Sequence, residues 1–214
     1  MILLIMGLPG TGKTTIAQYV ARHLQADILT TDLIRKALFE HTTIDEIMRV
    51  NNLLRYDLQE IFDRQPEYKV SKRIQQLIEK QKKMVYDALL ERLREIVQKG
   101  KTVVLDGTFF KRELREKVYS IAKETQSLIY VINCECPEEV IAKRMDRRKK
   151  RPDIASYVDK MKIYNIVKQH FESPLDDNVP LIIANTYTSE ITTYNIAHHD
   201  SQANQLIKIL KKRH

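Results

Sequence analysis

The sequence predicts an α/β protein in which helices cover both faces of a parallel β-sheet. Short apolar segments alternate with longer helical ones, a pattern typical of parallel strands joined by helical crossovers. A glycine-rich loop follows the first strand and an aspartate follows each of the next two, which gathers reactive groups at one edge of the sheet. The five predicted strands are Ile2–Met6, Asp27–Leu29, Thr102–Leu105, Leu128–Asn133 and Leu181–Ala184.

The helices between the strands are predicted from apolar periodicity and end signals. Apolar residues at helical spacing predict a long helix over residues 71–98, and Lys99-Gly100 provides its stop. Pro137 opens the helix that follows the fourth strand. Residues 154–171 and 201–211 predict two more helices. The stretch ITTYNIA, within residues 185–200, could form a short edge strand.

The length of 214 residues favours one domain that spans residues 1–214. Residues 40–100 form a long, mostly helical insertion between the second and third strands, where a substrate cap could sit. The sequence does not define the role of two segments, residues 40–70 and 185–200.

Composition excludes several classes of protein. Hydrophobic residues make up 43% of the chain and charged residues 30%, and no apolar run approaches the roughly 20 residues that a membrane-spanning helix needs. The N-terminal apolar run is too short for a secretory signal and leads directly into the glycine-rich loop. Two cysteines, Cys134 and Cys136, are too few for a metal cage. These features favour a protein of the reducing cytoplasm without a membrane partner.

The chain is basic, with a formal net charge of +8 and an isoelectric point near 9.3. Such a balance fits nucleic-acid binding, a site that handles phosphates, or an ordinary solvated basic surface. The charge alone does not choose among these three interpretations.

The stretch GLPGTGKTT, from Gly7 to Thr15, is the most specific motif. It fits G-x-x-x-x-G-K-[ST] at every fixed position, between an apolar strand and a helical pattern, as a P-loop requires. Successive backbone N–H groups would cradle the phosphates of ATP, Lys13 would reach the outer phosphates, and the Thr14 hydroxyl would ligate Mg²⁺. The predicted ATP contacts in this loop are Gly7, Leu8, Pro9, Gly10, Thr11, Gly12, Lys13, Thr14 and Thr15.

Acidic residues follow the second and third strands. Asp32 lies just past the second strand, where a carboxylate could accept the proton of an attacking substrate hydroxyl. Arg35, one helical turn later, could clamp a phosphate or carboxylate of the substrate. Asp106 ends the third strand in the manner of a Walker B aspartate, and it could hold Mg²⁺ or, with Thr108, orient the substrate. Asp32 could instead serve only as a helix cap, and Asp106 only as a turn residue.

The densest basic run is KRMDRRKKR, in which seven of the nine residues from Lys143 to Arg151 are Lys or Arg. We predict a mobile lid over residues 143–153. Arg144 would contact the nucleotide base and Arg148 the transferring phosphoryl group. A solvated helix end and a nucleic-acid-binding patch are the alternatives. Asn185, after the fifth strand, is a further candidate for the adenine end of ATP.

Taken together, GLPGTGKTT, TTDLIR, VVLDGTFF and CPEEVIAKRMDRRKKRPD resemble the P-loop kinases of the polynucleotide-kinase and zeta-toxin group and related ATP-binding proteins of the AAA_33 type. The resemblance covers roughly residues 1–175. It implies a three-layer α/β/α sandwich with a five-stranded parallel sheet in the order 2-3-1-4-5, and Mg·ATP as phosphate donor. It also implies Asp32 as general base, Arg35 as substrate clamp, and Arg144 and Arg148 as lid residues.

The leading hypothesis is an ATP-dependent kinase that phosphorylates a hydroxyl, either at a nucleic-acid 5′ end or on a small metabolite. One alternative is a nucleotide-gated regulator that hydrolyses ATP or GTP slowly, although the N-K-x-D pattern that specifies guanine is absent after the later strands. Another is a nucleic-acid-binding module that keeps the P-loop without phosphoryl transfer. The presence of Lys13, Thr14, Asp32 and Asp106 favours the kinase.

Overall fold

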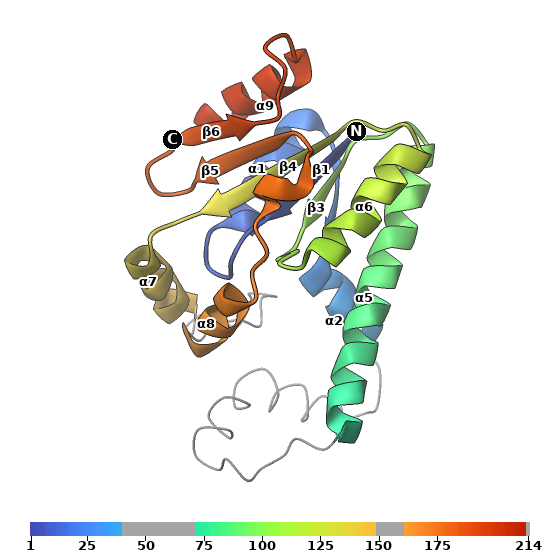
Figure 1. Cartoon of the computed structure of the whole chain (residues 1–214), viewed down its shortest axis with the longest axis vertical. Coiled ribbons are helices and arrows are strands. Elements are labelled where there is room, and N and C mark those ends of the chain that lie inside the picture. The colour runs from blue at the N-terminus through green and yellow to red at the C-terminus, as the bar shows by residue number, and fades with distance from the viewer. Residues whose placement is uncertain (40–71, 149–160, 213–214) are drawn as a thin grey trace.

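The structure is a computed structural model that describes residues 1–39, 72–148 and 161–212. Its centre is a six-stranded sheet in the order β2-β3-β1-β4-β5-β6 (Figure 1). The first five strands in this order are parallel, and β6 pairs antiparallel with β5. The strands are β1 (Ile2–Met6), β2 (Asp27–Thr30), β3 (Val103–Asp106), β4 (Ile129–Glu135), β5 (Leu181–Asn185) and β6 (Ile191–Tyr194).

The five parallel strands confirm the predicted order, but the predicted count of five was too low. The sixth strand comes from the ITTY segment, in which three of the four residues are exposed. A tight turn folds it back onto β5, because the Asn185 side-chain oxygen accepts hydrogen bonds from the backbone N–H groups of Tyr187 and Thr188. The short edge strand suggested for ITTYNIA is therefore present, and a side-chain-stabilised turn rather than apolar patterning sets it.

The helices lie where the apolar periodicity predicts them, with two additions that the sequence analysis did not delimit, α2 and α6. The long helix α5 runs over Lys72–Gln98, as expected, and the last helix, α9, over Ser201–Lys211. Of the helix predicted over residues 154–171, the part that the structure describes is α8. The remaining elements are α1 (Lys13–Leu24), α2 (Thr31–Phe39), α6 (Arg112–Glu124), α7 (Glu138–Arg148), α8 (Met161–Gln169) and a 3₁₀ turn, η1 (Pro174–Asp177).

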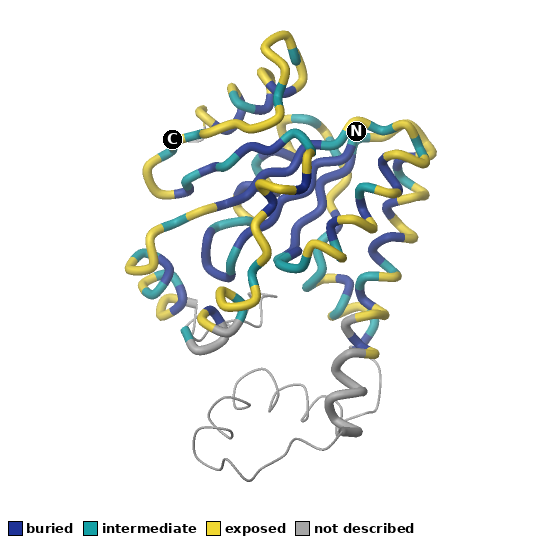
Figure 2. Tube along the Cα trace, viewed as in Figure 1, coloured by how far each residue is buried: buried dark blue, intermediate teal, exposed yellow. Residues whose placement is uncertain are grey.

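Two helical layers cover the sheet, which confirms the α/β/α arrangement (Figure 1). Helices α2, α5 and α6 pack on one face through side chains such as Ile34, Leu89 and Ile121. Helices α1 and α9 pack on the other, through side chains such as Val20 and Leu206. All five residues of β1 are fully buried, and Figure 2 shows burial concentrated along the central strands. A strand buried on both faces is apolar throughout, as this one is.

Part of the predicted insertion, residues 40–71, lies outside the described residues, as do residues 149–153 of the predicted lid. The substrate cap over 40–100 and the lid over 143–153 therefore stay predictions, with α5 and the end of α7 as their described parts. Within the described part of the chain, no helix combines the length and the apolar character that crossing a membrane requires.

Candidate active site

Strand register brings the predicted reactive groups to one edge of the sheet. Asp106 lies opposite Thr30 of β2 on one side and Ile5 of β1 on the other. The N–H of Gly107 donates to the carbonyl of Ile5 over 3.3 Å, just past this register. The carboxyl ends of β1, β2 and β3 thus meet at one place, which is where open parallel sheets bind ligands.

The glycine-rich loop that follows β1 requires glycine at its fixed positions. Gly7 has a φ of +137°, and a Cβ there would lie 2.4 Å from the carbonyl oxygen of Cys134. Gly12 has a φ of +92° and caps the N-terminus of α1. The first N–H groups of a helix have no acceptor within the helix, and they carry its positive dipole end. The loop and the start of α1 therefore form an anion-binding nest.

Lys13 and Thr14 stand at the start of α1, above this nest. The Lys13 ammonium donates to the Leu8 carbonyl oxygen over 2.8 Å, so it lies across the loop. The Thr11 hydroxyl donates to the same carbonyl over 2.8 Å. Thr14 is exposed, which leaves its hydroxyl accessible to a ligand. The roles predicted for both side chains toward phosphate and Mg²⁺ stay predictions.

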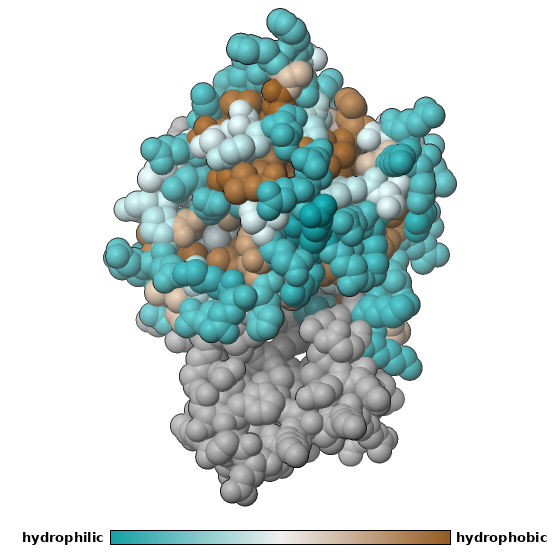
Figure 3. Space-filling view, in the orientation of Figure 1, coloured by the Kyte–Doolittle hydropathy of each residue, from teal (hydrophilic) through white to brown (hydrophobic). Residues whose placement is uncertain are grey.

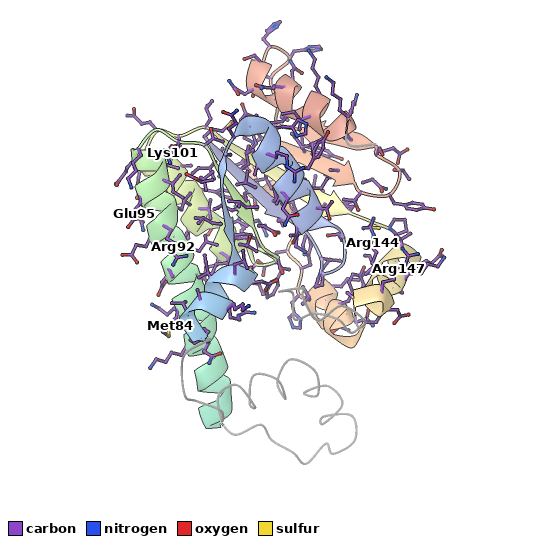
Figure 4. The ribbon with its side chains drawn as sticks, turned by 180° about the vertical axis from the view of Figure 1, so that it is seen from behind. Met84, Arg92, Glu95, Lys101, Arg144 and Arg147 are labelled. Carbon is purple, nitrogen blue, oxygen red and sulfur yellow. The ribbon has the colours of Figure 1, made fainter. Side chains whose placement is uncertain are left out.

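Arg144 of α7 clamps the loop from the other side. Its guanidinium donates to the Gly10 carbonyl over 3.3 Å, and to the hydroxyl and carbonyl oxygens of Thr186 over 3.0 and 3.2 Å. The Thr186 hydroxyl in turn donates to the Thr11 carbonyl over 2.5 Å. Helix α7, the loop and the end of β5 are thereby joined (Figure 4, where Arg144 and Arg147 mark α7). The sequence analysis assigned Asn185, together with the adjacent Thr186, to the adenine end of ATP. It did not predict this clamp, because a lone threonine after a strand carries no signal for such contacts.

A cavity of about 780 Å³ opens beside the loop. It joins one side of the loop to α2, to the end of β3, and to the helices α5 and α6. Among the predicted site residues, those that line the cavity are Pro9, Gly10, Gly12, Lys13, Thr14, Asp32, Arg35, Asp106 and Thr108. The predicted residues that do not line it are Gly7, Leu8, Thr11, Thr15, Arg144 and Asn185. The side chain of Arg148, the last residue of α7, lies outside the described ones.

Asp32 and Arg35 lie on the first turns of α2 and form a loose ion pair. The Arg35 nitrogen is 3.9 Å from the Asp32 carboxylate, and their side chains are 25% and 31% exposed. A pair this long and this open is weak, so a ligand that enters the cavity can compete for either group. The Thr31 hydroxyl donates to the Asp106 carbonyl over 3.5 Å, which ties the start of α2 to the end of β3.

Several lining residues come from α5 and α6, where the sequence analysis named no site residue. Tyr86 of α5 packs edge to face on Phe109, with the ring centroids 5.6 Å apart. Burial raises the pKa of Tyr86 to about 12, with smaller opposing effects from the charges of Arg35 and Asp32. The Tyr86 hydroxyl thus stays neutral at pH 7 and lies within the field of the predicted base. The sequence did not identify Tyr86 as a site residue, because an aromatic residue on the apolar face of a long amphipathic helix is usually part of the core.

A buried ion pair anchors the loop after β3. The Arg115 guanidinium of α6 and the Asp177 carboxylate of η1 are both 0% exposed and meet at 2.5 and 3.0 Å. Arg115 also donates to the carbonyl oxygens of Phe109, Glu172 and Ser173. Burial opposes the charge on the guanidinium, but the hydrogen bond and charge of Asp177 hold the pKa of Arg115 above its usual value. The pair fixes Phe109, and with it the rim that carries Thr108.

The residues present fit a nucleoside triphosphate with a magnesium ion. The loop has the backbone geometry of an anion nest, and a Cβ added at Gly12 would crowd the Arg144 guanidinium and the Thr186 hydroxyl at 3.3 Å. Thr14 and Asp106 line the same cavity and offer the oxygen ligands that Mg²⁺ prefers. The fold and this site define the class of protein as a P-loop α/β protein.

The sequence profile of the AAA_33 family, described as AAA domain, matches residues 2–174. The chain belongs to this family. The resemblance to P-loop kinases of the AAA_33 type is thereby confirmed.

Solved structures share the fold. One is a gluconokinase from Sinorhizobium meliloti 1021, with 15% identity over 97% of this chain and 87% of that chain and a TM-score of 0.53. A sugar kinase from Janibacter sp. HTCC2649 has 15% identity over 97% and 90% of the two chains, with a TM-score of 0.55. Kti12 from Chaetomium thermophilum, in complex with ADP-AlF3, has 17% identity over 99% and 96%, with a TM-score of 0.57. At such identities the likeness concerns the fold.

Among curated proteins, the uncharacterized protein Rv2004c of Mycobacterium tuberculosis is 26% identical over 147 residues. A counterpart from Mycobacterium bovis matches equally. The matched region is 69% of this chain, and this chain spans about 25% of the length of those relatives.

Proposed function

We propose that the chain is an ATP-dependent kinase that transfers the γ-phosphate to a hydroxyl of a nucleic-acid end or of a small metabolite. The observation that carries this proposal is one shared cavity. Lys13 and Thr14 of the phosphate-binding loop line it together with Asp32 and Asp106. Phosphoryl transfer needs mainly positioning and charge stabilisation, and these groups could supply both.

The donor end is formed by the loop. Its backbone N–H groups and the N-terminus of α1 bind the phosphates of ATP, and Lys13 exchanges the Leu8 carbonyl for an outer phosphate oxygen. Thr14 and Asp106 are the proposed holders of Mg²⁺, which neutralises phosphate charge during transfer. Arg144 and Asn185 lie on the far side of the loop from the cavity, where we place the adenine end.

The acceptor end is formed by α2 and the end of β3. Asp32 accepts the proton from the attacking hydroxyl, and Arg35 holds an anionic or polar group of the acceptor. Both side chains line the cavity. Asp106 and Thr108, which line the same cavity, orient the acceptor. Arg148, at the end of α7, is the residue that we propose to stabilise the negative charge on the phosphoryl group during transfer.

The comparisons support the same class of reaction. A sugar kinase and a gluconokinase have this fold, and their names support a hydroxyl acceptor. Kti12 was solved with ADP-AlF3, which supports nucleotide binding at the corresponding loop. Nothing in these names selects between a metabolite and a nucleic-acid end.

Asp32→Asn tests the proposal, because it keeps the size and hydrogen-bonding shape of the side chain and removes the base. Transfer of labelled phosphate from ATP is screened against 5′-OH DNA, 5′-OH RNA, transfer RNA and a panel of hydroxylated metabolites. We expect transfer to the best acceptor to fall about 10²- to 10⁴-fold while the dissociation constant for ATP is nearly unchanged. Full transfer by the variant would show that Asp32 is only structural. Hydrolysis of ATP by the wild type with no labelled acceptor would favour a nucleotide-gated regulator.

A further inference from the structure

The outer part of the cavity is built by two helices whose lining residues recur at helical spacing. On α5 these are Lys80, Lys83 and Tyr86, which are three residues apart and therefore share one face. On the side of α6, Lys111, Leu114 and Lys117 repeat the same spacing. The two stripes belong to one cavity, and the helices contact each other. In the view of Figure 3, hydrophilic side chains cover the side of the molecule that α5 and α6 form.

Positive charge exceeds negative charge in this outer part. The two stripes bring four lysines to the cavity, and the carboxylates beside them on the same elements are Asp87 and Glu113. Lys83 pairs with Asp87 at 2.7 Å and Lys117 with Glu113 at 3.1 Å. The partner of Lys111, Glu172, comes from outside the cavity lining. An anion that enters therefore meets a surplus of cationic groups.

The existing ion pairs do not block an anion. The paired side chains are 40–78% exposed, so each pair is screened by water and contributes little to stability. Lysine side chains are long and rotatable, and each ammonium has three donors, so it can bind a ligand and keep its carboxylate partner. The desolvation that would oppose anion binding is small at this open rim.

Tyr86 marks the inner end of the α5 stripe. Its pKa responds to the charges of Asp32 and Arg35, which places its hydroxyl within the field of the proposed base. From Tyr86, Lys83 lies roughly 5 Å and Lys80 roughly 9 Å further along the helix axis, at 1.5 Å per residue. Phe110 and Leu114 add apolar surface between the two stripes. The cavity thus offers a base at one end and cations several ångströms away.

We infer that Lys80, Lys83, Lys111 and Lys117 form an acceptor subsite for an anionic group, a phosphate or a carboxylate, that the acceptor carries apart from the hydroxyl that is phosphorylated. The inference rests on the proposed function, because the hydroxyl is placed by Asp32. Tyr86 donates a neutral hydroxyl to the body of the acceptor. Both a hydroxy acid and a nucleotide with a free 5′-hydroxyl carry this chemistry, and a neutral sugar does not.

The test uses matched pairs of acceptors that differ in the anionic group. Gluconate is compared with glucitol, and a nucleoside 3′-phosphate with its nucleoside. Both kcat/KM and calorimetric binding to the ADP-loaded full chain are measured. We expect the anionic member of at least one pair to be preferred, and the double variant Lys80→Gln, Lys83→Gln to reduce that preference about tenfold or more, since hydrogen bonds to charged groups are the stronger class. Which pair responds tells a hydroxy acid from a nucleotide.

Lys101→Gln is the matched control, because Lys101 is also an exposed lysine in a surface ion pair but lies near the opposite end of α5 (Figure 4). It should leave the preference unchanged. The inference is overturned if no anionic member binds better than its neutral partner, or if the double variant keeps the wild-type preference. Anion binding that depends on the lysines, without any transfer, would instead reject the proposed kinase and keep the subsite.

Discussion

Arg115→Ala should destabilise the protein by about 4 kcal/mol, within the range of 3–5 kcal/mol for removing one partner of a buried ion pair. The Asp177 side chain, which is 0% exposed, would keep the Tyr119 hydroxyl at 2.7 Å and a longer ion pair with Arg112 at 3.7 Å, but it would lose its two short hydrogen bonds from Arg115. The carbonyl oxygens of Phe109, Glu172 and Ser173 would lose a donor as well. Because domains are stable by only about 5–15 kcal/mol, this loss is large.

The assay is urea unfolding followed by circular dichroism, with the midpoint and slope fitted for each variant. Arg94→Ala is the control, since Arg94 makes a 3.5 Å pair with Glu124 in which both side chains are about half exposed. That variant should lose about 0–1 kcal/mol. If Arg115→Ala costs no more than Arg94→Ala, the buried pair does not anchor the loop after β3 and the reasoning is refuted.

Two further predictions concern contacts that tie down the ends of elements. Thr186→Val should lower the free energy of unfolding by about 1–3 kcal/mol, because it leaves the buried Thr11 carbonyl without this donor; Thr186→Ser should restore it, and equal urea midpoints for the two variants would count against the clamp. Asp200 caps α9 through Ala203, and hydrogen bonds from that N–H and from Tyr130 lower its pKa. Asp200→Ala should cost about 1 kcal/mol at pH 7. Because folding lowers the pKa of Asp200, the stability lost in the variant should be fully present above the ordinary carboxyl pKa. It should disappear as the pH falls through the lowered pKa of the folded state. If the variant stays less stable than the wild type in acid, the charge of Asp200 is not the source of the stabilisation.

Much of the fold followed from the sequence because apolar patterning and motif agree locally. The bounds of the five parallel strands differ from the predicted ones by at most two residues. The buried strands β1 and β3 were the plainest, since a strand buried on both faces is a nearly continuous apolar run. The phosphate loop was predictable because its glycines and Lys13 stand at fixed spacing. The edge strand β6 was only suggested, because its exposed ITTY residues lack an apolar face.

The site was predictable only where a motif or a strand end defines it. Asp32 and Asp106 were found from their places after strands, and both line the cavity. Tyr86, the lysines of α5 and the clamp between Thr186 and Arg144 were not found, because their roles depend on which helix faces which strand. Such long-range placement leaves no local periodicity in the sequence, and the Arg115 and Asp177 pair joins residues 62 positions apart.

The most direct test of the central claim is to follow the γ-phosphate of ATP itself. Wild type and Lys13→Ala are incubated with γ-labelled Mg·ATP and the acceptor panel, and labelled organic product is separated from inorganic phosphate. We expect the wild type to place label on a hydroxylated acceptor and Lys13→Ala, with an unchanged circular dichroism spectrum, to place none. Equal labelling by both proteins, or label that the wild type releases only as inorganic phosphate, would contradict the assignment of this cavity to phosphoryl transfer.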